Sequence, residues 1–565
     1  MNGSGPVTMV YVFQRQSYPH LAMGKPLNPH GKRESACPRR RRYWWTSTVL
    51  LFCNLGVTQT VGPAQAPSAG ESPRLLTLLE SLESTLANEP HLQIQQQQVE
   101  ISRALKQQAT GQFDLTLAGS FSQAHTNSPL TQAERALVVA EGFAPLSGTA
   151  QNLSILNLGA TKLYRTGVQI SPVYQRTRTT DNLTTTQGAN VSSIAFQIVV
   201  PLLRGRGRTA VGAQETSASV EVSAALLDLN QTISDLLAGT ATNYWNAVAA
   251  ARQLEVAWSS EKRGRTYVDN VQVLIQAERM PKSEINQATA NLAKRAADRI
   301  AAEQNLVRAQ QELAVAIGLD VAQMRHINFS FEDFPQPDLQ RLPVLNAEVI
   351  AEQVQQALSR RADYLATQRR VEESNVLLAA ARNALKPQLN LNFNTGVSGL
   401  SEGTDPAQFL NSPYRSIQGL DATAGITYNY PVHNNVAIGQ MRQAQAALTQ
   451  AQLRSADVRR RASSAIITSL NAVHNSAMQL DKARESVRFF EAALEGEREK
   501  FSLEFASLVD VLTIEDRLTT AMTDQVSAEL GYAVALTQLR SATGTIVDPY
   551  EEVHSVDRSL FFNMP

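Results

Sequence analysis

The sequence of 565 residues has few cysteines, no net charge and no long hydrophobic run. Its two cysteines, Cys37 and Cys53, are too few for a disulfide framework or a thiolate-rich metal site. Lysine plus arginine and aspartate plus glutamate both number 51, so no net positive field exists to hold a nucleic acid. No stretch reaches about 18 consecutive apolar residues, which excludes a conventional membrane-spanning helix. With 43% hydrophobic and 18% charged residues, the chain still has the material for a large folded core.

Sequence patterns that carry chemistry are also missing. Residues 207–212 have the spacing of a phosphate-binding loop, but Ala213 and Gln214 stand where lysine and serine or threonine are required. Ser398 lies between two glycines, at 396 and 399, but Leu400 takes the place of the second glycine of a nucleophile elbow. The histidines after residue 66 show no paired metal-ligand spacing. We therefore expect no enzyme activity, no cofactor and no bound metal.

Residues 1–66 are predicted to be a signal peptide with a long leader. They hold eight basic residues and one acid, and four of the arginines, at 39–42, directly precede a short apolar run. Ala64 and Ala66 supply the Ala-x-Ala site that completes a secretory signal. A membrane anchor is the alternative, but it needs about 20 apolar residues and this run is shorter.

The rest of the chain indicates an internal duplication. Gln253-Leu254 matches Gln479-Leu480, and Gly318 matches Gly544, at a constant separation of 226 positions. Such a separation is too long for a solenoid repeat. The predicted units are a first repeat at 67–320, a linker with an accessory strand at 321–345, a second repeat at 346–545 and a C-terminal tail at 546–565.

Each repeat is predicted to contain a helix, two strands, a very long helix and a returning helix. Apolar and polar residues alternate in 113–121 and 194–200, and again in 389–394 and 422–430, as in strands with one apolar face. Residues 209–277 and 436–501 contain no proline and little glycine, so we expect two helices on the order of 100 Å long. A further strand near 168–174, or others within 123–190, is left open.

Four strands per chain cannot close a transmembrane barrel, because the smallest such barrels have eight. Lipid does not tolerate open sheet edges, so several chains would have to share one barrel. Two chains would give eight strands and a filled interior, and three would give twelve and an open bore. Asp114, Thr116, Asn390 and Asn392 would face the lumen. The residues expected to face lipid are Phe113, Leu115, Leu117, Leu389, Leu391 and Phe393.

In this order of elements the sequence resembles the TolC-type outer-membrane efflux proteins. Three short motifs add to the resemblance: Pro-Leu-Leu-Arg-Gly at 201–205, Tyr-Pro at 430–431 before Asn-Asn at 434–435, and Phe501 followed by Asp-Val-Leu at 510–512. The resemblance implies a mostly α-helical protein with a membrane β-barrel part. It implies a homotrimer, in which a twelve-stranded β-barrel in the bacterial outer membrane stands on a twelve-helix α-barrel in the periplasm.

The same resemblance implies a function. The chain would be the passive outer-membrane exit duct of a tripartite efflux or type I secretion system. Its partners would be outer-membrane lipid, a periplasmic adaptor (membrane fusion) protein and, through the adaptor, an inner-membrane RND or ABC pump. Asp510 and its counterpart Glu284 are the candidates for acidic rings that narrow the periplasmic entrance. The alternative for Asp510 is structural, since Ser507-x-x-Asp510 is a helix capping box, and the two roles are compatible.

The helical tips are where the resemblance places contact with the adaptor. Glu504 replaces the family's glycine and Ala506 its basic gating residue, which argues against a salt-bridge gate of the family's kind. The expected docking residues are Arg279, Met280, Pro281, Lys282, Glu504, Phe505, Ala506 and Ser507.

The alternative function comes from another class of protein, a secreted periplasmic coiled-coil scaffold or adaptor. In that case the alternating strands would form a soluble sheet. Fusion-type adaptors usually carry one helical hairpin within lipoyl-like β-domains, whereas this sequence predicts two hairpins and no such domain.

Overall fold

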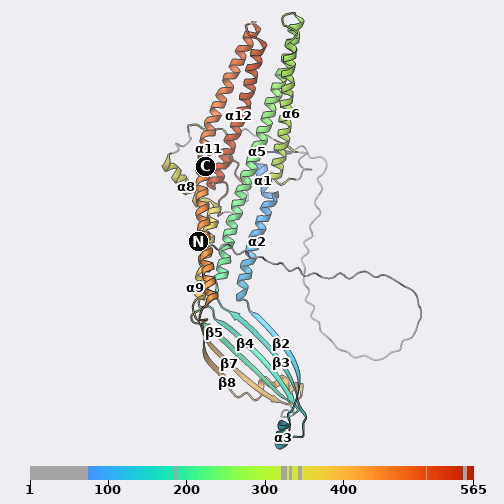
Figure 1. The fold of residues 1–565 in the computed structure, drawn as a ribbon, viewed down its shortest axis with the longest axis vertical. Coiled ribbons are helices and arrows are strands. Elements are labelled where there is room, and N and C mark those ends of the chain that lie inside the picture. Colours follow the sequence, from blue (N-terminus) through green and yellow to red (C-terminus); the bar gives the residue numbers. More distant parts are fainter. Residues whose placement is uncertain are drawn as a thin grey trace, which may run out of the picture. The chain divides into compact units, whose positions relative to one another are not determined.

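The computed structural model describes residues 74–182, 188–319, 327–329, 334–340, 346–503, 505–550 and 556–564 (Figure 1). The expected leader at 1–66 lies outside these residues. Across the described ranges, no helix combines the length and the apolar composition needed to cross a membrane.

Two short helices open the first repeat. α1 (Leu78–Asn88) begins with a capping box, in which Thr77 and Glu80 satisfy each other's backbone N–H groups. α2 (Pro90–Thr110) begins at Pro90, as the predicted break requires, because the fixed φ of proline suits the first helical turn. Most of α2 is exposed, and only Leu92, Val99 and Ser102 along it are buried.

Two very long helices dominate the fold. α5 (Ala213–Gln276) has 64 residues and α11 (Asn435–Ser502) has 68, so each is about 100 Å long. A returning helix packs along each of them, α6 (Glu284–Ala316) along α5 and α12 (Leu508–Thr543) along α11. Both predicted long helices are confirmed, except that Gly212 separates α5 from a short preceding helix, α4 (Arg208–Val211).

The helices nearest the sheet form a row. α2 packs against α5, α5 against α9 (Ala362–Ala384), and α9 against α11 (Figure 1). The preceding helix α8 (Ala347–Arg360) packs on α11 and α12. α2 and α11 are therefore the two ends of this row.

A six-stranded antiparallel sheet follows the helices. The prediction of four strands per chain is wrong, because residues 148–181 add a hairpin between the two expected strands of the first repeat. Short helices lie in two of the connections, α3 (Gln132–Ala140) after the first strand and α10 (Pro406–Asn411) before the last. The strand order is β2 (Thr116–Pro129), β3 (Gly148–Leu163), β4 (Gln169–Asp181), β5 (Ala189–Pro201), β7 (Gln388–Glu402) and β8 (Leu420–Asn429).

Two features obscure the added hairpin in the sequence. In β3 the large apolar residues take odd positions at 153 and 155, even positions at 156 and 158 and an odd position again at 163, so no single period-two pattern runs through the strand. In β4, Pro172 normally argues against a central strand. The structure accommodates it by leaving Ser171 and Pro172 out of the pairing between β3 and β4. The open possibility of a strand near 168–174 is confirmed as β4.

The start of β2 also differs from the prediction. The strand begins at Thr116, and Gly111–Phe113 form a turn of 3₁₀-helix in which the side chain of Phe113 is only 3% exposed. The Arg165 guanidinium lies 4.7 Å from the centre of the Phe113 ring, and Lys162 Nζ donates a hydrogen bond to its carbonyl. Phe113 is therefore not an outward-facing strand residue, because the β3–β4 hairpin covers it.

The largest buried cluster is in the helical part of the fold. Tyr244 and Trp245 of α5 are fully buried with ring centroids 5.3 Å apart, and Trp245 also packs edge-on against Phe562 at 5.5 Å. The predicted accessory strand of the linker is present as β6 (Ile327–Phe329), which pairs in parallel with β1 (Arg74–Leu76). Because Phe562 packs against Trp245, the C-terminal residues belong to the core of the helical part.

Candidate functional site: a two-faced sheet and two helical tips

The register of the sheet sorts its side chains onto two different faces. One lateral row of paired residues, from β2 to β8, consists of Gly119, Leu158, Tyr174, Ile194, Val397 and Leu420. The adjacent row, from β2 to β7, consists of Ser120, Asn157, Gln175, Ser193 and Ser398. Because successive residues of a strand point to opposite faces, these rows define an apolar face and a polar face.

The apolar face is uncovered over much of its area. Leu117 is 75% exposed, Phe196 48% and Ile426 70%, although each lies within a paired strand. An exposed apolar patch spread over several strands marks contact with lipid or with a partner. Four of the residues predicted to face lipid lie on this face, and Leu115 directly precedes β2. The four are Leu117, Leu389, Leu391 and Phe393.

The polar face carries amides and hydroxyls that bond across strands. Asn392 Nδ2 donates to Thr427 Oγ1 at 2.6 Å, and Asn157 Nδ2 donates to Ser120 Oγ at 3.4 Å. Thr116, Asn390 and Asn392 share this face, whereas Asp114 precedes the strand. This face is therefore suited to water.

The sheet and the helix row end on the same two chain segments. β2 and β8 are the edge strands, and each presents one row of backbone groups without a partner strand in the described chain. α2 leads into β2, and β8 leads into α11. On α2, Ile94, Ile101 and Leu105 are more than half exposed and follow each other by seven and four positions, the spacing of a coiled-coil seam. Both sheet edges therefore leave backbone groups open to further pairing, and the α2 side adds exposed apolar side chains.

The tip of the first helical hairpin is the connection 277–283 between α5 and α6. Arg279, Pro281 and Lys282 are exposed there. Met280 is half-buried, in a cluster that includes Val271 of α5 and Leu508 of α12. Apolar packing between the two hairpins thus reaches their tips.

The tip of the second hairpin, between α11 and α12, exposes an aromatic residue and caps α12. Phe505 is 83% exposed, Ala506 is half-buried, and Glu504 lies outside the described residues. Ser507 donates to the Asp510 carboxylate from its hydroxyl at 2.6 Å and from its N–H at 3.0 Å, and the Asp510 N–H donates back to the hydroxyl. These bonds, the hydroxyl first, hold the pKa of Asp510 below its ordinary value. The predicted capping box is confirmed.

Both candidate constriction acids lie in the first turn of a returning helix. Glu284 is the first residue of α6 and is half-buried, while Asp510 is exposed in the first turn of α12. The positive end of a helix dipole favours a negative charge at these positions.

A buried ion-pair network, which the sequence analysis missed, joins the two hairpins. Glu515 of α12 is fully buried, and its Oε1 accepts bonds from Arg263 Nε at 2.6 Å and from Arg295 Nη1 at 3.1 Å. Arg295, only 4% exposed, also donates to Asp516 at 3.0 Å. One signal was available: Glu515 precedes the buried Leu518 by three positions, so an acid occupies the apolar stripe of α12.

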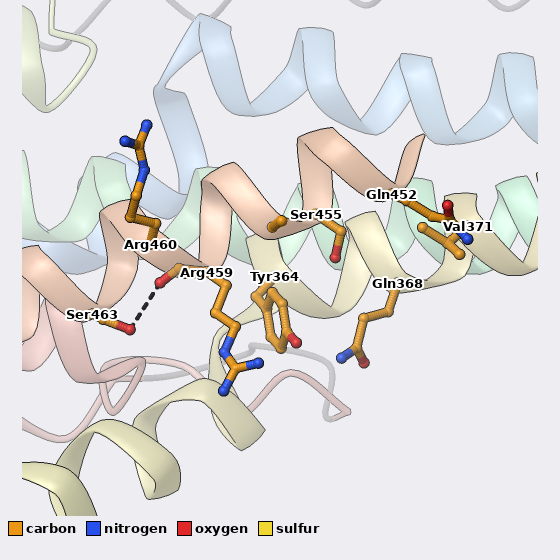
Figure 2. A pocket seen from close by; sticks show the side chains of 9 residues that line it. Tyr364, Gln368, Val371, Gln452, Ser455, Arg459, Arg460 and Ser463 are labelled. Carbon is orange, nitrogen blue, oxygen red and sulfur yellow. Dashed lines mark hydrogen bonds between the residues drawn. The ribbon is translucent and has the colours of Figure 1, made fainter. Parts of the chain in front are cut away.

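An open groove of about 520 Å³ runs between α9 and α11 (Figure 2). Tyr364 and Gln368 line it from α9, and Arg459 and Ser463 line it from α11, where Ser463 Oγ donates to the Arg459 carbonyl at 2.9 Å. The lining includes two arginines but no acid, histidine or cysteine. These side chains therefore do not form an acid–base or nucleophilic arrangement.

Comparison with known proteins finds similarity to solved structures. No family model and no curated protein matches the chain. The outer-membrane channel CmeC of Campylobacter jejuni is 15% identical, with a TM-score of 0.59, and the match covers 86% of this chain and 92% of CmeC. The outer-membrane channel OprN is 14% identical, with a TM-score of 0.59 and coverages of 84% and 94%. The MtrE outer-membrane channel of Neisseria gonorrhoeae is 16% identical, with a TM-score of 0.57 and coverages of 83% and 88%.

These matches extend over most of the chain and over nearly the whole of each channel. The resemblance that the sequence predicts is thus confirmed at the level of the fold: the chain has the fold of the outer-membrane channels.

Proposed function

We propose that three copies of this chain form a passive exit duct through the bacterial outer membrane and the periplasm. The apolar face carries this proposal, because its row of paired residues runs in register across all six strands while both sheet edges stay open. In a membrane wall, lipid would contact the apolar face and water in the lumen would contact the polar face. Neighbouring copies would supply the pairing that the two edge strands lack. The likeness in fold to outer-membrane channels supports the outer membrane as the location of the duct.

The subunits would close head to tail. The α2–β2 side of one copy would pair with the β8–α11 side of the next, so that the sheets form a barrel and the helix rows form a tube. Three copies with four such helices each give the twelve-helix tube that the family resemblance implies.

The tips of the two helical hairpins would form the periplasmic end of the duct, opposite the sheet. Arg279, Lys282 and the exposed Phe505 would dock a periplasmic adaptor, since exposed aromatic and arginine side chains are common anchors of interfaces. Through the adaptor the duct would serve an inner-membrane RND or ABC pump, in tripartite efflux or type I secretion. Phe505→Ala should weaken cross-linking to the adaptor, whereas replacement of the half-buried Ala506 by serine should not.

Asp510 and Glu284 would form acidic rings at the entrance, three copies of each around the axis. Such rings favour cations. Single-channel recordings of Asp510→Ala should therefore show a weaker cation preference than the wild type. An unchanged preference would remove Asp510 from the ring.

Neighbouring residues of β7 test the membrane assignment. Phe393 lies on the apolar face and Asn394 on the polar face. Arginine facing lipid near the bilayer midplane costs about 2–4 kcal/mol, whereas a lumen position tolerates it. Phe393→Arg should therefore reduce the heat-sensitive trimer in the outer-membrane fraction, while Asn394→Arg should assemble and shift ion selectivity towards anions.

The alternative function is a soluble periplasmic scaffold. An uncovered apolar face of this extent disfavours it, because soluble monomers rarely expose such patches. Cell fractionation separates the two functions, since a soluble monomer in the periplasmic fraction would contradict the duct.

A further inference from the structure

The β3–β4 hairpin lies in the middle of the sheet, between β2 and β5 (Figure 1). Because adjacent strands are antiparallel throughout, β2 ends and β5 begins at the same end of the sheet. A single connection would suffice to join them, as one joins β7 to β8. The chain instead adds two further strands, β3 and β4, between them.

An ion pair fastens the turn of this hairpin to the helices. Arg165, in the turn, donates two hydrogen bonds to Glu215 of α5, from Nε at 2.7 Å and from Nη2 at 2.6 Å. Its guanidinium also covers the ring of Phe113, just before β2. The Arg165 bonds lower the pKa of Glu215, so the pair stays charged. The turn is thus attached to both flanking elements.

The backbone of the turn is also built for this position. The Gly207 N–H donates to the Thr166 carbonyl at 3.0 Å. Gly167 has a φ of +93°, and a Cβ atom there would lie 2.2 Å from the Gly205 carbonyl oxygen. Only glycine fits such a close approach of two chain segments. The hairpin is therefore an integral part of the junction between sheet and helices.

In its half nearest the helices the hairpin also continues both faces of the sheet, whereas farther along β4 Arg176 and Arg178 lie on the apolar face. Leu158 and Tyr174 extend the apolar row, and Asn157 and Gln175 extend the polar row. A hairpin that stood outside the membrane would have no need of this two-faced pattern.

We infer that the β3–β4 hairpin is part of the membrane wall, so that each copy contributes six strands and the duct has an eighteen-stranded barrel. This inference rests on the proposed trimeric duct. With six alternating strands, β2 and β8 run in opposite directions, so head-to-tail closure keeps the pairing antiparallel throughout. The barrel would therefore differ from the twelve-stranded one that the family resemblance implies.

The added strands widen the outlet. With strands about 4.8 Å apart and tilted by about 40°, the backbone diameter is about 24 Å for twelve strands and about 36 Å for eighteen. Side chains that line the wall leave a bore of about 14 Å in the first case and about 25 Å in the second. The class of cargo that this outlet admits is thus bulky solutes, up to about 20 Å across.

Adjacent residues of β3 test whether the hairpin lies in the wall. Leu158→Arg places a charge on the apolar face, and Asn157→Arg places it on the polar face. We expect Leu158→Arg to lower the heat-sensitive outer-membrane trimer by about tenfold or more, the same effect expected of Phe393→Arg. Asn157→Arg should stay within about twofold of the wild type.

The outcomes separate this inference from the proposed function. If Phe393→Arg is harmful but Leu158→Arg is not, the hairpin lies outside the membrane and only the inference falls. Equal losses from Leu158→Arg and Asn157→Arg also overturn it. If neither Phe393→Arg nor Leu158→Arg reduces the trimer, the membrane duct itself is wrong.

Excision of the hairpin tests the width. Replacement of residues 130–188 by a short glycine–serine loop removes two whole strands, so Gly119 and Ile194 remain in line and each remaining strand keeps its faces. Graded polyethylene glycols, added on the sheet side of single channels in planar bilayers, report the largest polymer that enters. The excised channel should admit polymers only up to a little over half the diameter that the wild type admits, about 14 Å against about 25 Å. Equal polymer-size limits in the two channels would overturn the wider barrel. A wild-type size limit of about 14 Å would also overturn it, whether or not the excised chain assembles.

Discussion

Asp510 is held in its charged form by the residue that caps its own helix. The Ser507 hydroxyl and N–H bind the carboxylate and lower its pKa. Because the folded-state pKa is lowered, these bonds stabilise the start of α12 above the ordinary aspartate pKa of about 3.9, and this stability is lost as the pH falls through the lowered value. Ser507→Ala removes the hydroxyl that contributes most. We therefore expect Asp510 to lose its charge at a higher pH in this variant than in the wild type.

Cation preference, recorded as the reversal potential across a salt gradient between about pH 6 and about pH 3, measures this titration. Its midpoint should lie higher in Ser507→Ala than in the wild type, and Asp510→Asn should lose the part of the titration that Asp510 contributes. Identical midpoints in the wild type and in Ser507→Ala would contradict the role given to the hydroxyl.

Roles that are set within one helical turn could be predicted from the sequence, and roles that depend on distant packing could not. Ser507 and Asp510 form the capping box that their spacing indicates. Phe113 is misplaced by the alternation pattern, because that pattern does not report a 3₁₀ turn. Arg295 and Glu515 are 220 positions apart and meet only through the packing of α6 against α12, so no local pattern joins them.

At the scale of whole elements, the network around Glu515 couples the two helical hairpins. Removal of one partner of a buried ion pair typically costs about 3–5 kcal/mol, because the other charge stays buried. Glu515→Leu should therefore destabilise the helical part by about this amount, and Arg295→Met in the same chain should recover part of the loss, with a coupling of about 1–3 kcal/mol. Urea unfolding of the detergent-solubilised protein, followed by helical circular dichroism, measures these changes.

Arg265→Ala is the matched control for this prediction. The Arg265 side chain is 69% exposed, and its partner Glu261, 13% exposed, keeps Arg299 as a second partner when Arg265 is removed. Exposed pairs contribute about 0–1 kcal/mol, so this variant should unfold almost as the wild type does. Strictly additive losses from Glu515→Leu and Arg295→Met would show that the network does not couple the hairpins.

The helices and strands differ in how well the sequence predicts them. The absence of proline over more than sixty residues is enough to predict α5 and α11, and strict alternation predicts β5, β7 and β8. β3 changes the parity of its apolar residues midway, and β4 contains a proline, so these strands are stabilised by their neighbours more than by a pattern of their own.

At the scale of the whole molecule, the two open edges determine how copies can assemble. β2 and β8 differ in sequence and run in opposite directions, so the edge of one copy complements the other edge of the next. Such head-to-tail contacts form a closed ring or an open filament, depending on the rotation between copies. The helix row ends on the same sides, with α2 before β2 and α11 after β8, so one contact would close both the sheet and the tube.

Paired cysteines on the two edges count the copies in the ring. In a Cys37→Ser, Cys53→Ser background, Ser120→Cys on β2 is combined in turn with a cysteine at Thr423, Gly425 or Thr427 on the polar face of β8. Laterally paired residues of antiparallel strands have Cα atoms about 4.5–5.5 Å apart, within the range that a disulfide spans. At the correct register, oxidation in membranes should give covalent species up to three chains and none larger, because a closed threefold ring leaves no free edge. Ser120→Cys alone should give no covalent trimer. A ladder beyond three chains would indicate an open filament, and the absence of cross-links at every register would show that β2 and β8 do not pair between copies.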